Sequence, residues 1–107
     1  MTNVLLHKLI LGDYGPGGWC RYKLPLEALQ AHVYVVGVTR KGKSKFLEHL
    51  AHQLVALGQG VAVLDPHSDL ADSLLARLAP LEGDGLGRRP IYFDPNRSDF
   101  LLPFNVL

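Results

Sequence analysis

The sequence predicts an α/β fold with a mostly parallel sheet, in the order β-α-β-α-β from residue 33. Three short apolar runs carry this prediction, at residues 33–36, 61–64 and 90–93. Because these runs have little polar alternation and are rich in β-branched or aromatic residues, they are typical of strands buried on both faces. A helix is expected after each of the first two, and strands that alternate with helices form parallel sheets with right-handed crossovers.

The two helices are predicted from apolar periodicity and from the residues that flank them. The first is expected to begin near Lys43 and to run to about Leu57, because apolar side chains recur there at helical spacing. Gly58 is expected to end it. The second helix is expected to begin at a cap formed by Ser68 or Asp69.

The N-terminal part of the chain reads as a separate segment. Residues 4–11 and 19–24 predict two strands of a hairpin joined by a long loop rich in glycine. Pro25 is expected to open a short helical turn, since proline is tolerated at a first helical position. We therefore expect residues 1–31 to lead into one α/β domain that covers residues 32–107.

Length and composition are those of one small globular domain. With 107 residues, of which 48% are hydrophobic and 20% are charged, the chain is neither disordered nor fibrous in composition. A net charge of +1 gives no reason for the whole molecule to bind DNA or an anionic membrane, although a local basic cluster can still bind a polyanion. No apolar run reaches the ~20 residues of a membrane span. One cysteine, Cys20, suits a reducing compartment, so we expect a cytoplasmic protein.

The motif that carries chemistry is Gly37-Val38-Thr39-Arg40-Lys41-Gly42-Lys43-Ser44. It matches G-x-x-x-x-G-K-S/T and lies between a predicted strand and a predicted helix. Such a loop binds phosphate through backbone N–H groups, which requires glycine where the backbone turns sharply. Lys43 can neutralise the β- and γ-phosphates, and Ser44 can offer its hydroxyl to the Mg²⁺ that bridges them. The motif predicts binding of ATP or a related nucleoside triphosphate together with Mg²⁺.

A basic cluster surrounds this motif. Arg40, Lys41, Lys43 and Lys45 place four cations within six residues. They either supplement the charge around a bound phosphate or face solvent. Arg40 stands where many P-loops have glycine, so a positive φ at this position would cost on the order of 1 kcal/mol. The residues expected to contact nucleotide are therefore residues 37–45.

Three blocks of sequence resemble the ATPase domain of the FtsK/HerA superfamily. Residues 32–44, preceded by Leu24-Pro25-Leu26-Glu27-Ala28-Leu29, resemble its beginning. Residues 64–71 resemble its D-P-H-G-D-L-A segment, with Ser68 in place of the glycine. Residues 91–95 and 103–107 resemble the stretch that ends in N-x-L. The likeness covers about residues 24–107 and is nearest to HerA-like ATPases and to type IV secretion coupling proteins of the TraG/TraD kind.

The resemblance implies a RecA-like ATPase that assembles as a ring of identical subunits and moves DNA by hydrolysing ATP. The Thr39-Arg40 pair has precedent in that family. The family's acidic Walker B strand lies further along than the residues of this chain, so we expect a partial domain that binds ATP and leave hydrolysis open. The membrane segments of many coupling proteins are also absent from the sequence, which favours the HerA-like branch.

Two other functions remain open from the sequence. The chain could be a non-catalytic module derived from a P-loop domain that associates with a partner ATPase through an open sheet edge. It could also be a small nucleotide kinase, which needs an arginine-rich lid over the acceptor. The loop at residues 82–89 is a poor candidate for such a lid.

Several other polar residues have two interpretations each. Asp65 follows the second predicted strand, where it can either reach Mg²⁺ through water or only end the strand. Asp65, His67 and Asp69 alternate as in some metal sites, but turn and capping roles are favoured. His49 and His52 share a helix face without further ligands nearby, so we expect surface histidines.

Overall fold

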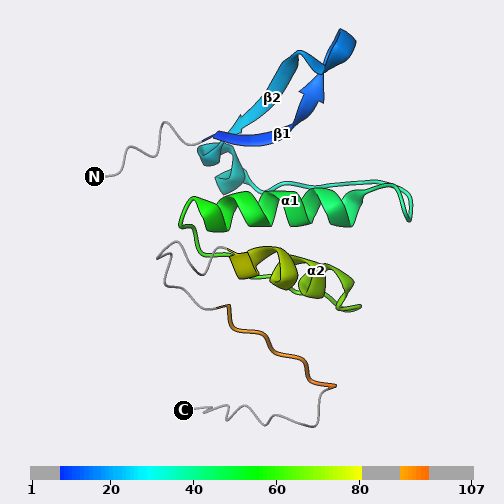
Figure 1. Cartoon of the computed structure of the whole chain (residues 1–107), viewed down its shortest axis with the longest axis vertical. Helices are drawn as coiled ribbons and strands as arrows, with labels where there is room; N and C mark the ends of the chain where they lie inside the picture. Colours follow the sequence, from blue (N-terminus) through cyan, green and yellow to red (C-terminus); the bar gives the residue numbers. More distant parts are fainter. Residues whose placement is uncertain (1–7, 81–89, 97–107) are drawn as a thin grey trace.

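The computed structural model describes residues 8–80 and 90–96 (Figure 1). Its elements, in chain order, are strand β1 (Lys8–Tyr14), the 3₁₀ turn η2 (Pro16–Gly18), strand β2 (Cys20–Pro25), the 3₁₀ helix η3 (Leu26–Ala31), helix α1 (Lys43–Ala56) and helix α2 (Asp69–Leu78). Figure 1 shows α1 between the β1–β2 hairpin and α2. None of the helices in the described ranges is both long and apolar enough to span a membrane.

The predicted N-terminal hairpin is confirmed. β1 and β2 pair in antiparallel fashion, and the register shifts between Ile10 and Gly12. β1 continues to Tyr14, three residues further than expected, while the expected start of this strand at residues 4–7 lies outside the described residues. The short helical turn expected after Pro25 is also present as η3.

Both predicted α-helices are confirmed as well. α1 begins at Lys43, and Gly58 follows its end in the left-handed conformation with a φ of 73°. The Gly58 N–H donates a hydrogen bond to the Val55 carbonyl at 2.8 Å, a bond of the kind that satisfies the last carbonyls of a helix. α2 places Leu74 in the interior.

The predicted parallel sheet is wrong. In the described part of the chain the sheet consists of β1 and β2 alone, and residues 33–36, 61–64 and 90–93 form no strand. The RecA-like sheet implied by the resemblance is therefore not formed by these residues. Their side chains are not buried either, since Tyr34, Leu64 and Ile91 are 91%, 96% and 91% exposed.

Two of these runs line an open groove and do not pair with each other. Residues 61–63 and 90–96 both line a groove of about 1300 Å³, together with side chains of α2. Neighbouring strands must approach to about 4.8 Å to exchange backbone hydrogen bonds. An apolar run indicates that a segment could be buried on both faces of a sheet, but it does not determine which other strand pairs with it. The loop expected at residues 82–89 and the apolar residues 103–107 lie outside the described residues.

The described core is small and centred on α1. Its buried apolar side chains are those of Leu9, Leu50, Ala51 and Leu74. They come from β1, α1 and α2, so α1 is covered by the hairpin on one side and by α2 on the other (Figure 1). This position fixes α1, and the loop of residues 37–42 ends at the N-terminus of this helix.

Polar side chains of α1 hold β1 at Ile10. Gln53 Oε1 accepts a hydrogen bond from the Ile10 N–H at 2.7 Å, and Gln53 Nε2 donates one to the Ile10 carbonyl at 2.9 Å. His49 Nε2 lies 3.0 Å from the same carbonyl oxygen. His49 and His52, which were expected at the surface, are both half-buried.

Glu48 joins α1 to α2 through a buried carboxylate. Glu48 is 5% exposed, and its oxygens lie 2.8 Å from Lys45 Nζ and 3.5 Å from Arg77 Nη1. The hydrogen bond from Lys45 holds the pKa of Glu48 below its ordinary value of 4.5, and the charges of Lys45 and Arg77 add to this. Burial acts in the opposite direction. The neighbouring His52 has a lowered pKa, because of burial and the charge of Arg77.

We predict that Glu48 contributes stability that is lost in acid. Because its pKa is lower in the folded chain than its ordinary value of 4.5, the folded state favours the charged carboxylate. The contribution is complete above pH 4.5 and decreases as the pH falls below that value. Urea denaturation of wild type and Glu48→Gln should therefore show a difference in unfolding free energy that shrinks from pH 6 to pH 3. A difference that grows over this range would contradict the role of Lys45 and Arg77 at Glu48.

Candidate phosphate-binding loop

The residues of the predicted phosphate loop lie between an extended segment and α1. The chain turns at residues 38–41, where the Lys41 N–H donates to the Val38 carbonyl at 3.3 Å. Gly42 is the residue that precedes α1, and its carbonyl accepts the first helical hydrogen bond from the Phe46 N–H at 2.9 Å. The loop therefore ends directly at the N-terminus of a helix, where backbone N–H groups are not used by the helix itself.

Gly42 has the backbone conformation that the motif requires. Its φ and ψ are 89° and 5°, in the left-handed region that favours glycine. A Cβ at this position would meet no heavy atom within 4 Å, so open space adjoins the backbone. Within residues 8–80 and 90–96, no side chain makes a capping hydrogen bond at this end of α1. A phosphate oxygen could therefore approach the start of the helix, where the helix dipole favours negative charge.

Lys43 crosses the loop toward Gly37. Its Nζ donates a hydrogen bond to the Gly37 carbonyl. A Cβ on Gly37 would lie 3.0 Å from Lys43 Cγ and 3.2 Å from Cδ, closer than side chains normally pack. Glycine at position 37 therefore leaves room for the lysine, whereas its φ is not positive, so the left-handed conformation of this loop's glycines is found at Gly42 alone.

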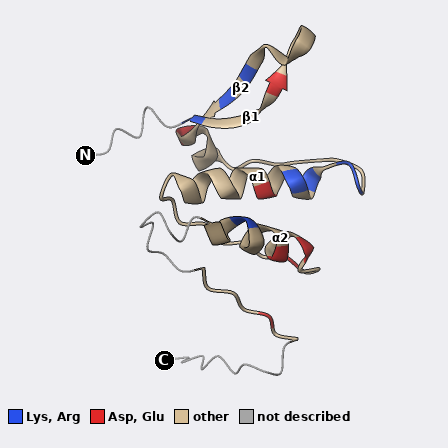
Figure 2. Cartoon of the chain, in the orientation of Figure 1, with Lys and Arg blue, Asp and Glu red and all other residues tan. Residues whose placement is uncertain are grey.

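The loop borders a small, open basic pocket. Its volume is about 390 Å³, within the ~300–1,000 Å³ of small-molecule sites. The residues that line it are Thr39, Arg40, Gly42, Lys43, Ser44 and Lys45. Six of the nine residues predicted to contact nucleotide are thus brought together, while Gly37, Val38 and Lys41 do not line the pocket. Figure 2 shows basic residues gathered at the loop and at the start of α1.

Arg40 adopts the positive φ that the motif suggested. Its φ is 63°, which for a residue with a Cβ costs on the order of 1 kcal/mol. The side chain is exposed and lines the pocket. The loop thus carries a cation at a position where glycine would be free of strain.

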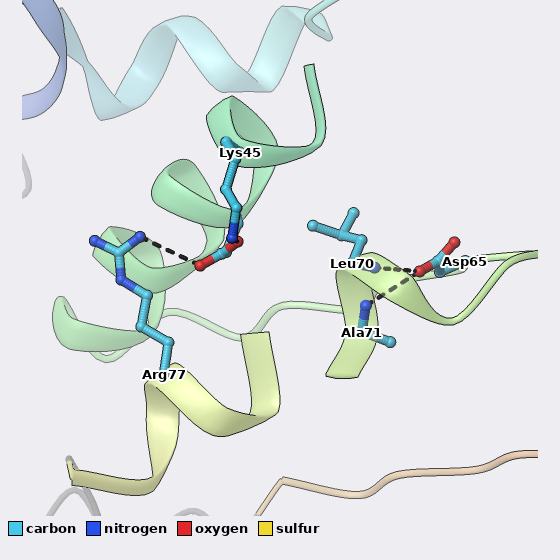
Figure 3. Close-up of polar contacts among 6 residues, drawn as sticks. Lys45, Asp65, Leu70, Ala71 and Arg77 are labelled. Atoms are coloured by element: carbon cyan, nitrogen blue, oxygen red, sulfur yellow. Dashed lines mark hydrogen bonds and ion pairs between the residues drawn. The ribbon is translucent and has the colours of Figure 1, made fainter. Parts of the chain in front are cut away.

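Asp65 organises the start of α2. Its Oδ2 accepts hydrogen bonds from the Leu70 N–H at 2.8 Å and the Ala71 N–H at 3.1 Å (Figure 3). Its Oδ1 accepts the His67 N–H at 3.1 Å. The N–H groups of His67, Ala71 and Leu70 together lower the pKa of the Asp65 carboxyl. These bonds favour a capping role for Asp65 over a role as a metal ligand.

The cap expected at Ser68 or Asp69 is therefore wrong. Ser68 precedes α2 with a φ of 65°, and its side chain makes no capping hydrogen bond. Asp69 is the first residue of the helix. The carboxylate that performs the capping belongs to Asp65, four residues before the helix begins, and local capping rules do not reach that far.

The described residues contain no protein-only metal site. In residues 8–80 and 90–96, no three His, Cys, Asp or Glu side chains are placed to hold one ion. The alternation of Asp65, His67 and Asp69 and the pair His49 and His52 therefore form no such group. Ser44, expected to reach Mg²⁺ through a bound nucleotide, is the exposed second residue of α1 and lines the pocket.

Comparison of the chain with protein-family models, with curated proteins and with solved structures found no match in any of the three. The resemblance to the FtsK/HerA superfamily thus depends on the residues quoted above.

The conformation of Gly42 can be tested by stability. We expect Gly42→Ala to lower the free energy of unfolding by about 1–2 kcal/mol, because alanine is strained at this φ although no neighbouring atom is in its way. Gly60→Ala is the matched control, since Gly60 also has open space around it but no positive φ. Equal unfolding free energies for the two variants in urea would contradict the left-handed conformation at Gly42.

Proposed function

We propose that this chain binds the phosphate chain of a nucleoside triphosphate, in the form of ATP with Mg²⁺, at the pocket that precedes α1. The observation that carries the proposal is the pocket itself. It combines Arg40, Lys43 and Lys45 with an uncapped helix N-terminus and open space beside Gly42. Positive charge and free backbone N–H groups at one place are what a polyphosphate requires.

Lys43, Ser44 and the backbone at the start of α1 each have a defined contribution in this proposal. Lys43 exchanges the Gly37 carbonyl for the β- and γ-phosphate oxygens, a contact with stronger electrostatic attraction. The backbone N–H groups at the start of α1 donate to phosphate oxygens that approach over Gly42. The Ser44 hydroxyl would hold the Mg²⁺ that accompanies the nucleotide, and this ion would supply positive charge that neutralises the phosphates.

The proposal concerns binding and not hydrolysis. Among the described residues that line the pocket, none carries a carboxylate that could activate water. Membership of the FtsK/HerA superfamily, a ring of identical subunits and DNA as a partner are proposals that rest on the sequence resemblance. A cytoplasmic location is proposed as well, and it is supported by the exposed free thiol of Cys20.

The decisive variant is Lys43→Ala. We expect it to raise the dissociation constant for Mg²⁺-ATP by about 10- to 100-fold, because hydrogen bonds to charged groups contribute roughly 1.5–3 kcal/mol. Isothermal titration calorimetry measures both constants. Lys23→Ala is the matched control, since Lys23 is an exposed lysine on β2, outside the pocket. Equal affinity of wild type and Lys43→Ala would refute the proposed site.

A second candidate function is association with another protein chain. The observation that favours it is the exposure of large apolar side chains on the extended segments, with Tyr34, Leu64 and Ile91 each more than 90% exposed. The open parallel edge first expected for this role is not formed by the described residues. Association would instead use the side chains of these segments.

Light scattering at increasing protein concentration tests this second function. We expect the average mass to rise above that of the 11.8 kDa monomer, and we expect Tyr34→Ser to reduce the rise because it removes apolar area from the contact. Tyr14→Ser is the control, since Tyr14 is also exposed but belongs to the hairpin. A constant monomer mass over the whole range would exclude self-association.

A further inference from the structure

Lys45 takes part in two different sites. Its side chain lines the basic pocket that precedes α1. Its Nζ also donates a hydrogen bond to Glu48 Oε2 at 2.8 Å, one turn along the helix. Because the Lys45 side chain is 74% exposed, its ammonium group is able to rotate between Glu48 and an anion in the pocket. The strength of its contact with Glu48 therefore affects how much charge it can give to a phosphate.

Glu48 has a second cation on its other oxygen. Arg77 Nη1, from α2, lies 3.5 Å from Glu48 Oε1 (Figure 3). Glu48 is 7% exposed at its side chain, whereas Arg77 is 41% exposed. One buried carboxylate is thus shared by a lysine from the phosphate loop's own helix and an arginine from the neighbouring helix.

We propose that Arg77 tunes the phosphate site through Glu48, by neutralising this carboxylate when Lys45 turns toward a bound phosphate. This inference rests on the proposed function and assigns Glu48 and Arg77 as positioning residues, which do not touch the ligand. Arg77 raises the affinity for phosphate, and Glu48 lowers it. The two residues therefore act on affinity in opposite directions.

The physical reason is the cost of a buried charge without a partner. If Lys45 left a buried carboxylate that had no other cation, the carboxylate would lose its neutralising partner while still out of water. Arg77 lowers the cost of leaving Glu48 without Lys45, because its guanidinium lies beside Glu48 Oε1. The guanidinium also stays charged at any ordinary pH. Without Arg77, Glu48 holds Lys45 more tightly and the ammonium group is less available to phosphate.

A set of variants at these residues tests the inference by calorimetry with Mg²⁺-ATP and, separately, with inorganic tripolyphosphate. Relative to wild type, we expect Glu48→Gln to tighten binding and Arg77→Gln to weaken it, each by about two- to fivefold, the range of single ion pairs near a protein surface. In the Glu48→Gln background, Arg77→Gln should have no further effect. In a Lys45→Gln background, neither change should alter affinity.

The opposite signs separate this inference from a purely structural role. If Glu48 and Arg77 only held the helices together, both single variants would weaken binding, and that result would overturn the inference. Binding that depends on Lys43 but is unchanged by Glu48→Gln and Arg77→Gln would also overturn it while leaving the proposed function intact. If Lys43→Ala binds as wild type does, the proposed function fails and the inference fails with it. Circular dichroism of each variant confirms that α1 and α2 are retained.

Discussion

A carboxylate that is removed from water needs cations close to it, and Glu48 obtains one from each side. Lys45 reaches it from the first turn of α1, and Arg77 reaches it from the last turn of α2. This requirement fixes how the two helices lie relative to each other, because Arg77 can meet Glu48 only if α2 packs along α1. It also fixes Lys45, whose side chain borders the basic pocket. The packing of the helices and the charge of the pocket are therefore parts of one arrangement.

The opposite face of α1 is held by hydrogen bonds from its side chains to the backbone of β1. Gln53 and His49 contact the backbone of Ile10. Leu9, the residue before Ile10 in β1, is fully buried. The helix that carries the loop is thus fixed by ionic contacts on one side and by side chain to backbone contacts on the other. In the proposed function the loop presents backbone N–H groups to phosphate. Such binding depends on a fixed helix, since a small displacement of the donors weakens every contact at once.

Local features of the fold were predictable from the sequence, whereas contacts between distant residues were not. Periodicity identified α1 and α2, glycine at position 58 identified the end of α1, and the P-loop motif identified the left-handed turn at Gly42 and the residues of the pocket. Each of these depends on residues close together in the chain. The parallel sheet was wrong because residues 61–64 and 90–93 carry the right side chains for strands without determining which segments lie beside them.

The motifs did not reveal the full roles of two residues. For Asp65 the sequence favoured a turn or capping role over metal binding, and the structure shows which helix it caps, one that begins four residues later. Glu48 sits on a helix with lysine three residues before it, which resembles a surface ion pair. Only the approach of Arg77 from α2 makes it a buried, shared carboxylate. Partners that are separated by 29 or more residues leave no periodic trace in the sequence.

The pairing of Gln53 with Ile10 has a consequence for how this protein behaves in concentrated solution. An outer strand of a sheet offers free donors and acceptors to any extended chain that passes, and this is a common route to aggregation. At Ile10 the amide of Gln53 occupies both the donor and the acceptor, so a foreign strand cannot add there without displacing it. A side chain of α1 therefore prevents strand addition at this position of the hairpin edge. The other extended segments of the molecule expose much apolar surface.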